Sequence, residues 1–125
     1  MNAMAYNPLI LLVENNEREA QLLKRILESE GFNVDTVYSC WAALERIKDK
    51  RYASAILDFV LPDMKGDELA DKIKLDNPGM RVILLTGFLH AIDAKKLEKF
   101  KYVFEKPADP KKILEALREI TRDFK

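Results

Sequence analysis

The chain has 125 residues, which fits one compact domain with a hydrophobic core and leaves no room for a second functional module. Hydrophobic residues make up 48% of the sequence and charged residues 34%, a composition typical of a globular rather than a disordered protein. Basic and acidic residues balance at 21 each, so no overall basic field attracts nucleic acid or an anionic membrane. DNA binding by this domain alone is therefore disfavoured.

The first half of the chain alternates strand and helix patterns. Leu9 to Val13 is a continuous apolar run, typical of a parallel strand buried on both faces. From about Glu17 to Glu30 the apolar residues fall on one face of a helix, and Gly31 supplies its end. Val34 to Tyr38 predicts a second strand. A helix capped by Ser39 follows, and its inner face carries Ala43, Leu44 and Ile47.

The second half repeats the alternation. A third strand is predicted at Ala55 to Leu57, and a helix through Leu69 and Ile73 then ends at the strong breaker Asn77-Pro78-Gly79. The remaining predicted elements are a strand from Arg81 to Leu85, a short helix from Ala91 to Phe100, a strand from Tyr102 to Glu105 and a last helix that begins at Pro110.

Five alternations of strand and helix predict an α/β fold in which helices cover both faces of a parallel sheet. We expect a flavodoxin-like (βα)5 three-layer sandwich with strand order 2-1-3-4-5 and a switch point between the first and third strands. Glu14 and Asn15 follow the first of these strands, and Asp58 follows the third. These side chains should meet at the crevice where such sheets bind ligands.

Cys40 and the start of the chain bear on the compartment of the protein. A single cysteine permits no internal disulfide, and we interpret Cys40 as a small packing residue. Met1 to Asn7 has no positively charged start, and the apolar run after Pro8 is too short for a signal core or a membrane span. These features predict a cytoplasmic protein that does not bind membranes.

Asp58 is the candidate nucleophile, because a carboxylate at the end of a buried strand can form an acyl-phosphate. Thr86 follows the fourth strand, and the pair Lys106-Pro107 follows the fifth. Each residue also has a plainer interpretation: Glu14 and Asn15 as helix caps, Thr86 as a locally bonded hydroxyl, and Lys106 as a solvated charge. Their order along the chain favours a common site.

Four segments in order carry a family resemblance: Leu11-Leu12-Val13-Glu14-Asn15-Asn16-Glu17, Leu57-Asp58 through Pro62-Asp63-Met64-Lys65-Gly66, Leu84-Leu85-Thr86-Gly87, and Glu105-Lys106-Pro107. With these segments the chain resembles, from about Leu9 to Phe124, the receiver domain of two-component response regulators, and the chemotaxis regulators among them. The resemblance predicts a single receiver domain over residues 1–125, with its core at about 8–124 and no output domain.

The resemblance also implies roles for the site residues. Asp58 would accept a phosphoryl group from a histidine kinase or phosphotransfer protein, Lys106 would pair with the phosphoryl oxygens, and Thr86 would donate its hydroxyl to them. Mg²⁺ would be held by Asp58, by the side chain at position 15, by Glu14 through water and by the backbone carbonyl of Val60. Such a domain is a phosphoacceptor that assists its own phosphorylation and dephosphorylation rather than an enzyme in the usual sense.

Three departures from the family pattern change these expectations. Asn15 stands where most receivers have an aspartate, so magnesium should bind more weakly. Val103 stands where the family places a switching aromatic, which leaves Tyr102 or Phe104 as the ring that moves instead. Val60 and Phe88 are apolar at positions that line the path of attacking water, and they predict slow loss of the phosphoryl group.

The signal is expected to leave through the face formed by the fourth helix, fifth strand and fifth helix, where an effector protein would bind. The alternative is a pseudo-receiver, a phosphorylation-independent binding module whose metal site Asn15 has weakened. A phosphatase with an aspartate nucleophile is disfavoured, because Val60 stands where its second acid would be. No glycine-rich loop follows the first strand, so nucleotide binding is disfavoured too.

Overall fold

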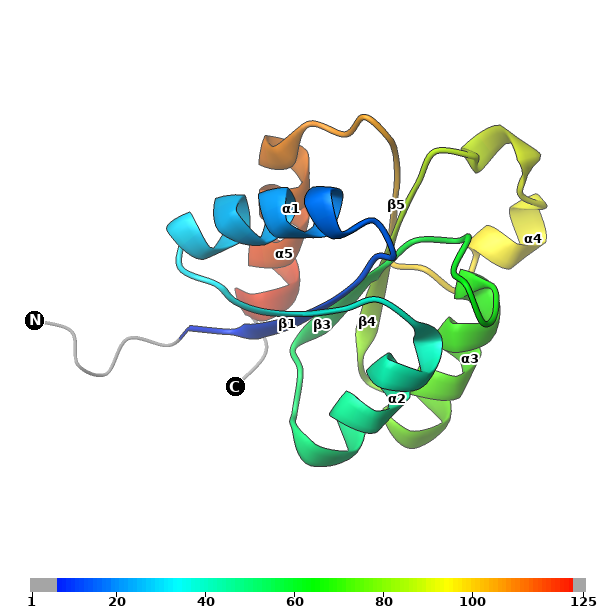
Figure 1. Ribbon diagram of the computed structural model, residues 1–125, viewed down its shortest axis with the longest axis horizontal. Coiled ribbons are helices and arrows are strands. Elements are labelled where there is room, and N and C mark those ends of the chain that lie inside the picture. Colours follow the sequence, from blue (N-terminus) through cyan, green and yellow to red (C-terminus); the bar gives the residue numbers. More distant parts are fainter. Residues whose placement is uncertain (1–6, 123–125) are drawn as a thin grey trace, which may run out of the picture.

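The computed structural model describes residues 7–122, which fold around one five-stranded parallel sheet (Figure 1). The strand order is β2-β1-β3-β4-β5, which confirms the predicted flavodoxin-like topology. The strands are β1 (Leu9–Val13), β2 (Asn33–Val37), β3 (Ser54–Leu57), β4 (Arg81–Thr86) and β5 (Tyr102–Glu105).

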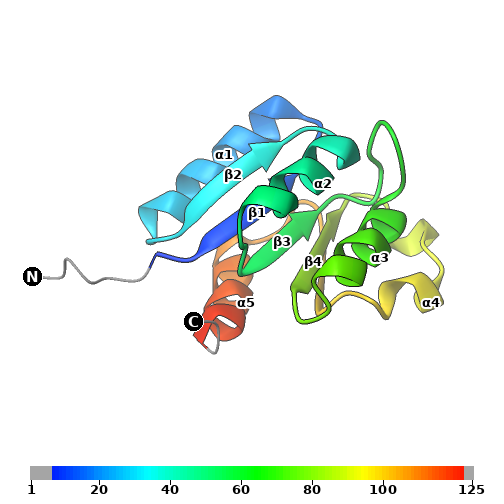
Figure 2. The ribbon, with the colours of Figure 1, turned by 90° about the horizontal axis from the view of Figure 1, so that it is seen from below.

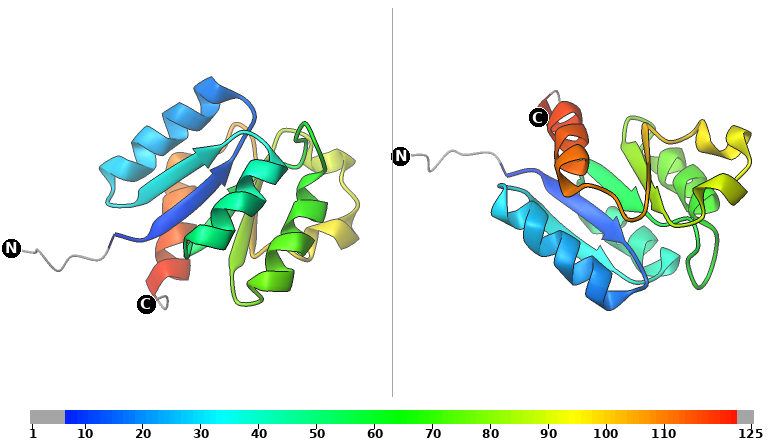
Figure 3. Two further views of the ribbon diagram at one scale, coloured as in Figure 1. Left: turned by 60° about the horizontal axis from the view of Figure 1, so that its bottom comes forward. Right: turned by 90° about the horizontal axis from the view of Figure 1, so that it is seen from above.

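The helices form the two outer layers. They are α1 (Glu17–Ser29), α2 (Cys40–Asp49), α3 (Gly66–Asp76), α4 (Ala94–Leu97) and α5 (Pro110–Arg122), with a 3₁₀ turn at Leu89–Ala91. Viewed from below, α2 and α3 lie in front of the sheet while α1 and α5 lie behind it (Figure 2). The two views of Figure 3 show α4 beside α3, near the edge of the sheet formed by β4 and β5.

Two hydrophobic clusters fill the space on either side of the sheet, because successive strand residues point to opposite faces. In β1, Leu11 and Val13 pack toward α2 and α3, whereas Ile10 and Leu12 pack toward α1 and α5. Buried Cys40 belongs to the first of these clusters, as predicted for a packing residue. Burial raises the pKa of its thiol to about 12, and hydrogen bonding and repulsion from Asp63 add to this effect.

Local signals fix several helix ends, and those at Gly31 and Ser39 were predicted. Asn16 caps α1 through its side chain, which accepts a hydrogen bond from the backbone of Glu19 at 3.0 Å. Gly31 has φ of 99°, a left-handed conformation that glycine adopts without strain, and it follows the end of α1. Ser39 caps α2, as expected from the sequence.

The predicted helix from Ala91 to Phe100 is wrong in its extent. The segment forms a 3₁₀ turn at Leu89–Ala91, then the extended residue Ile92, and then the single turn α4. Ile92 and Phe100 are both buried in the cluster on the α3 side. The backbone of Ile92 is extended, a conformation that does not occur inside a helix. Burial of Ile92 therefore outweighs helix formation in this short, lysine-rich segment.

Candidate functional site

The candidate site lies at the carboxyl ends of β1 and β3, where the chain direction switches from one side of the sheet to the other. The backbone N–H of Asp58 donates to the carbonyl of Val13 at 3.1 Å, so the residue after β3 is held beside the end of β1. The N–H of Glu14 similarly donates to Val37 at 3.1 Å. These two bonds fix Glu14 and Asp58 as neighbours.

Lys106, from the loop after β5, connects the acidic residues of the site. Its ammonium nitrogen Nζ lies 2.5 Å from Glu14 Oε1, 2.9 Å from Glu19 Oε1 and 3.1 Å from Asp58 Oδ2. The Glu14 side chain is 7% exposed and that of Asp58 is 12% exposed, whereas Glu19 is 53% exposed. One ammonium thus contacts a buried carboxylate, a partly buried one and one at the surface.

The charge balance of this cluster favours a protonated lysine. Burial alone would lower the pKa of Lys106, but hydrogen bonds to Glu14 and Glu19 and the charge of Asp58 outweigh it and raise the pKa above its ordinary value. Three carboxylates against one ammonium still leave two uncompensated negative charges. The site therefore attracts a further cation.

Two hydrogen bonds orient the acidic groups before any ligand binds. Glu14 Oε2 accepts the backbone N–H of Asn16 at 2.9 Å, which leaves Oε1 to face Lys106. Asp58 Oδ1 accepts a long bond of 3.4 Å from the N–H of Val60, while Oδ2 faces Lys106. Asn16, rather than Glu14 or Asn15, caps α1, so the plainer reading of these two residues as caps is wrong.

Thr86 is fully buried at the end of β4. Its hydroxyl oxygen accepts the backbone N–H of Phe88 at 3.3 Å, and its carbonyl accepts the N–H of Lys106 at 2.9 Å. The threonine is therefore tied both to the segment that leads to α4 and to the lysine of the site. Its hydroxyl hydrogen is left to donate elsewhere.

The loop after Asp58 closes tightly on itself. Gly66 donates its N–H to the carbonyl of Phe59 at 2.7 Å, and a Cβ at this position would overlap the carbonyl oxygen of Asp58 and approach Phe59 Cα to 2.9 Å. A glycine is required here because the start of α3 packs directly against the backbone of Asp58. Val60 and Lys65 close the loop with an isolated antiparallel bridge.

Asp63 fastens the same loop to α2. Its two carboxylate oxygens accept the backbone N–H groups of Cys40 at 2.9 Å and Trp41 at 3.0 Å, which are unpaired donors at the first turn of the helix. Burial would raise the pKa of Asp63, but the hydrogen bonds from these two N–H groups outweigh it, and the pKa is lowered. Sequence analysis gave Asp63 no role of its own.

Asn15 and Val60 lie next to the acidic residues, and both side chains are exposed. Residues 7–122 contain no group of three or more His, Cys, Asp or Glu side chains with metal-binding geometry. The oxygens that converge are those of Glu14, Glu19 and Asp58 around Lys106, and the amide of Asn15 and the carbonyl of Val60 adjoin them in the sequence. This set fits a hard cation that keeps several waters, such as Mg²⁺, in a site weaker than one with a carboxylate at position 15.

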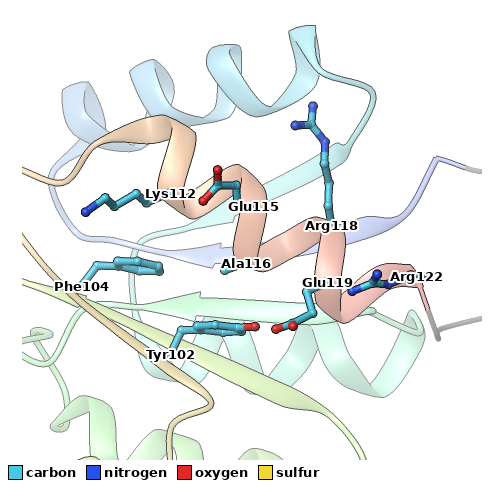
Figure 4. Close-up of a pocket in the computed structure, with 8 residues that line it drawn as sticks. All are labelled: Tyr102, Phe104, Lys112, Glu115, Ala116, Arg118, Glu119 and Arg122. Atoms are coloured by element: carbon cyan, nitrogen blue, oxygen red, sulfur yellow. The ribbon is translucent and has the colours of Figure 1, made fainter.

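The structure corrects the expectation that Tyr102 or Phe104 takes the place of the missing switch aromatic. Val103 pairs with Leu84 and packs in the cluster on the α3 side, the face to which Leu84 also points. Tyr102 and Phe104 point to the other face, where their rings stack with centroids 6.2 Å apart beside α5 (Figure 4). Neighbouring strand residues face opposite sides, so neither ring can replace Val103.

Glu19 also contacts the site, although the sequence pattern did not predict it. It lies three residues after the cap Asn16, where a glutamate ordinarily serves the helix end itself. Instead its carboxylate contacts Lys106, which is distant in sequence. A signal was available in retrospect, because the first turn of a helix that follows β1 must lie at the same sheet edge as Lys106.

The strand order and the parallel sheet define a flavodoxin-like domain, in which Glu14 and Asp58 lie at the switch point and Lys106 from the loop after β5 contacts both. The model of the response regulator receiver domain family matches residues 10–118. The chain belongs to this family, whose members are signalling domains of two-component systems rather than ordinary enzymes. Response regulators in general interact with histidine kinases and downstream effectors.

The chain is similar to several characterised response regulators. It is 30% identical over 79 residues to the response regulator receiver protein CpdR of Brucella abortus, covering 63% of this chain and 66% of CpdR. It is 28% identical over 118 residues to the transcriptional regulatory protein SrrA of Staphylococcus aureus, covering 90% of this chain but 47% of SrrA. The chain thus spans about half to two thirds of the length of these two relatives.

Solved receiver structures share the fold. A CheY-like receiver domain from Methanospirillum hungatei superposes with a TM-score of 0.82 at 28% identity, covering 94% of this chain and 99% of the other. The response regulator TrrA of Thermotoga maritima, solved with Mg²⁺ and BeF, gives a TM-score of 0.84 at 26% identity over 90% of this chain and 98% of TrrA. Across residues 7–122, no helix has the length and apolar character needed to cross a bilayer.

Proposed function

We propose that this chain is a phosphoacceptor receiver domain that takes a phosphoryl group onto Asp58 from a histidine kinase or phosphotransfer protein. The observation that carries the proposal is the contact of Lys106 Nζ with Asp58 Oδ2 at 3.1 Å, at the carboxyl end of β3. An ammonium beside the nucleophile stabilises the negative charge that gathers on a transferring phosphoryl group.

In the proposed reaction a carboxylate oxygen of Asp58 attacks the phosphorus of a phosphohistidine. A P–O bond forms while the P–N bond breaks, and the electron pair of that bond goes to the imidazole nitrogen of the donor. Lys106 then pairs with the phosphoryl oxygens as a compact charge, and Thr86 donates its hydroxyl hydrogen to one of them. If the Thr86 hydroxyl moves toward the phosphoryl group, it can keep the hydrogen bond from the N–H of Phe88 only if the segment around Phe88 moves as well.

The residues that would hold magnesium are Asp58, Glu14 through water, Asn15 and the backbone carbonyl of Val60. A bound divalent cation would neutralise the repulsion between the carboxylate and the incoming phosphoryl oxygens. Asn15 contributes an oxygen without a charge, so we expect binding to be weaker than at an aspartate. Val60 and Phe88 are both exposed apolar side chains near the site, and they would slow attack by water on the acyl phosphate.

The output is proposed to be a changed protein-binding surface around α4, β5 and α5, recognised by an effector protein. Thr86 supports this direction, because its hydroxyl contacts the backbone of Phe88, at the start of the segment that leads to α4. The described fold forms one domain around one sheet, and we propose that residues 1–125 act as a single receiver module.

Chemical labelling tests the proposal. Incubation with acetyl phosphate and magnesium should add one acid-stable, base-labile phosphoryl group, located by mass spectrometry at Asp58. The variant Asp58→Asn should accept none, whereas Asp76→Asn, the same change at the exposed end of α3, should be labelled like the wild type. Labelling of Asp58→Asn, or of a serine or threonine, contradicts the assignment of the nucleophile.

The same experiment separates the proposal from its alternative. A pseudo-receiver would remain unlabelled at every magnesium concentration, with acetyl phosphate and with a phosphorylated kinase domain alike. The feature that favours this alternative is the neutral side chain at Asn15. A wild-type protein that stays unlabelled at high magnesium while Asn15→Asp becomes labelled would establish the pseudo-receiver.

A further inference from the structure

We propose that Glu19 is a positioning residue that holds the ammonium of Lys106 when a divalent cation binds at the site formed by Glu14 and Asp58. This inference rests on the proposed function, because it concerns regulation of the same site. Glu19 lies outside the set of predicted metal ligands, and it is the third carboxylate that contacts Lys106.

The ligand-free arrangement places Lys106 where it obstructs a metal. Its Nζ lies 2.5 Å from Glu14 and 3.1 Å from Asp58, so the ammonium already pairs with two of the carboxylates that would hold a divalent cation. Two cations at such short range repel strongly in a site with little water. Binding of the divalent cation must therefore displace the ammonium from both carboxylates.

Glu19 offers a partner for the displaced ammonium at no great cost. Its Oε1 already lies 2.9 Å from Lys106 Nζ, so the lysine can give up its other two bonds without losing all of its charge pairing. Glu19 is 53% exposed while Glu14 is 7% exposed, so movement toward Glu19 would take the ammonium toward the surface. The phosphoryl group can later draw it back.

The first turn of α1 keeps Glu19 in place. Its backbone N–H donates to Asn16 Oδ1 at 3.0 Å, and Asn16 in turn donates its own N–H to Glu14 Oε2 at 2.9 Å. A short chain of bonds thus links the backbone of Glu19 to one of the carboxylates that Lys106 leaves.

Magnesium titration by calorimetry of the full chain tests the inference, with Glu17→Gln as the matched control. Glu17 and Glu19 share the first turn of α1 and are both exposed, but only Glu19 contacts Lys106. We expect Glu19→Gln to weaken magnesium binding about threefold to fivefold, as for an exposed ion pair, and Glu17→Gln to weaken it less than about twofold. In a Lys106→Met background the two substitutions should have equal effects, because the ammonium is absent.

Labelling with acetyl phosphate supplies a second reading that a merely structural role would not produce. In Glu19→Gln the magnesium concentration for half-maximal labelling should rise about threefold to fivefold, while the rate at saturating magnesium should stay at or above that of the wild type. A structural defect would lower that maximal rate as well.

Three results would overturn the inference: equal magnesium affinity of Glu19→Gln and Glu17→Gln, an effect of Glu19→Gln that persists undiminished without Lys106, or no magnesium binding by the wild type. None of them depends on labelling, so they are distinct from failure of the proposed function. That function fails if the wild type is not phosphorylated at Asp58, whatever the calorimetry shows.

Discussion

Substitution of Lys106 by methionine removes the charge that balances two buried carboxylates while keeping an apolar side chain of similar length. In the absence of magnesium we expect this variant to be less stable than the wild type. Glu14 and Asp58 would face each other with side chains that are only 7% and 12% exposed and with no cation between them. Burial of unpaired charge is among the few single changes that destabilise strongly.

The magnitude follows from the burial of the three groups. Breaking a fully buried ion pair by removing one partner costs about 3–5 kcal/mol. Lys106 retains 23% exposure and water reaches Asp58, so we expect a smaller loss of about 2–3 kcal/mol in the free energy of unfolding. The exposed Glu19 adds little to this figure. For a domain of this length the loss corresponds to a fall in Tm of roughly 6–15 °C.

Thermal unfolding with and without magnesium provides the measurement. The control Lys112→Met makes the same change on an exposed lysine of α5, and its Tm should stay close to that of the wild type. Magnesium should restore most of the lost stability of Lys106→Met, because a divalent cation replaces the ammonium between the carboxylates. If Lys106→Met matches its control, or if magnesium fails to narrow the difference, the account of the site as a cation-balanced acidic pair is wrong.

Three further predictions concern the surrounding residues. Asn15→Asp should tighten magnesium binding by an amount on the order of 1–2 kcal/mol, because it adds a carboxylate beside the cation; equal or weaker affinity by calorimetry would remove Asn15 from the ligand set. Gly66→Ala should lower Tm and the labelling rate together, because its Cβ would collide with the backbone of Asp58, whereas Gly79→Ala, where a Cβ meets nothing within 4 Å, should spare the labelling rate. The lowered pKa of Asp63 means that its bonds to the start of α2 stabilise the fold above the ordinary value of about 3.8 and are lost as pH falls through the lower folded value. Asp63→Asn should therefore be less stable than the wild type at pH 7, with a gap that narrows below about pH 4 in chemical denaturation.

The sequence predicted the sheet well because parallel strands buried on both faces appear as unbroken apolar runs. Leu9 to Val13 needs no tertiary information to be assigned as a strand, and its neighbours then follow from the alternation with helices. The positions of Glu14, Asp58 and Lys106 followed from topology, since all three come directly after strands whose ends meet. The predicted helix at Ala91 to Phe100 failed because its boundaries depend on which of its few apolar residues reach the core.

Two features of the structure were not predicted, for different reasons: the contact of Glu19 with Lys106, and the orientation of the aromatic pair of β5. The contact of Glu19 with Lys106 is a tertiary pairing across most of the chain, and local patterns offer a helix-capping explanation that is sufficient by itself. The orientation of Tyr102 and Phe104 was available from the sequence, because residues on either side of Val103 must face the opposite side of a strand. The contact between Glu19 and Lys106 could be predicted only from the topology of the sheet. The orientation of Tyr102 and Phe104 could be predicted from the alternation of side chains along one strand.

The orientation of β5 also predicts where a signal can travel. Thr86 shares its face of the sheet with Leu84 and Val103, and its hydroxyl accepts the N–H of Phe88 at 3.3 Å, so a phosphoryl group that draws this hydroxyl must disturb Gly87 to Ala91. The small Val103 leaves no ring to lock one state, and we expect a modest population shift. Hydrogen exchange with and without beryllofluoride, a mimic of the acyl phosphate, should show altered protection from Gly87 through α4 to Val103 in β5. Changes confined to the loop between Asp58 and Lys65 would show that the signal does not leave by this face.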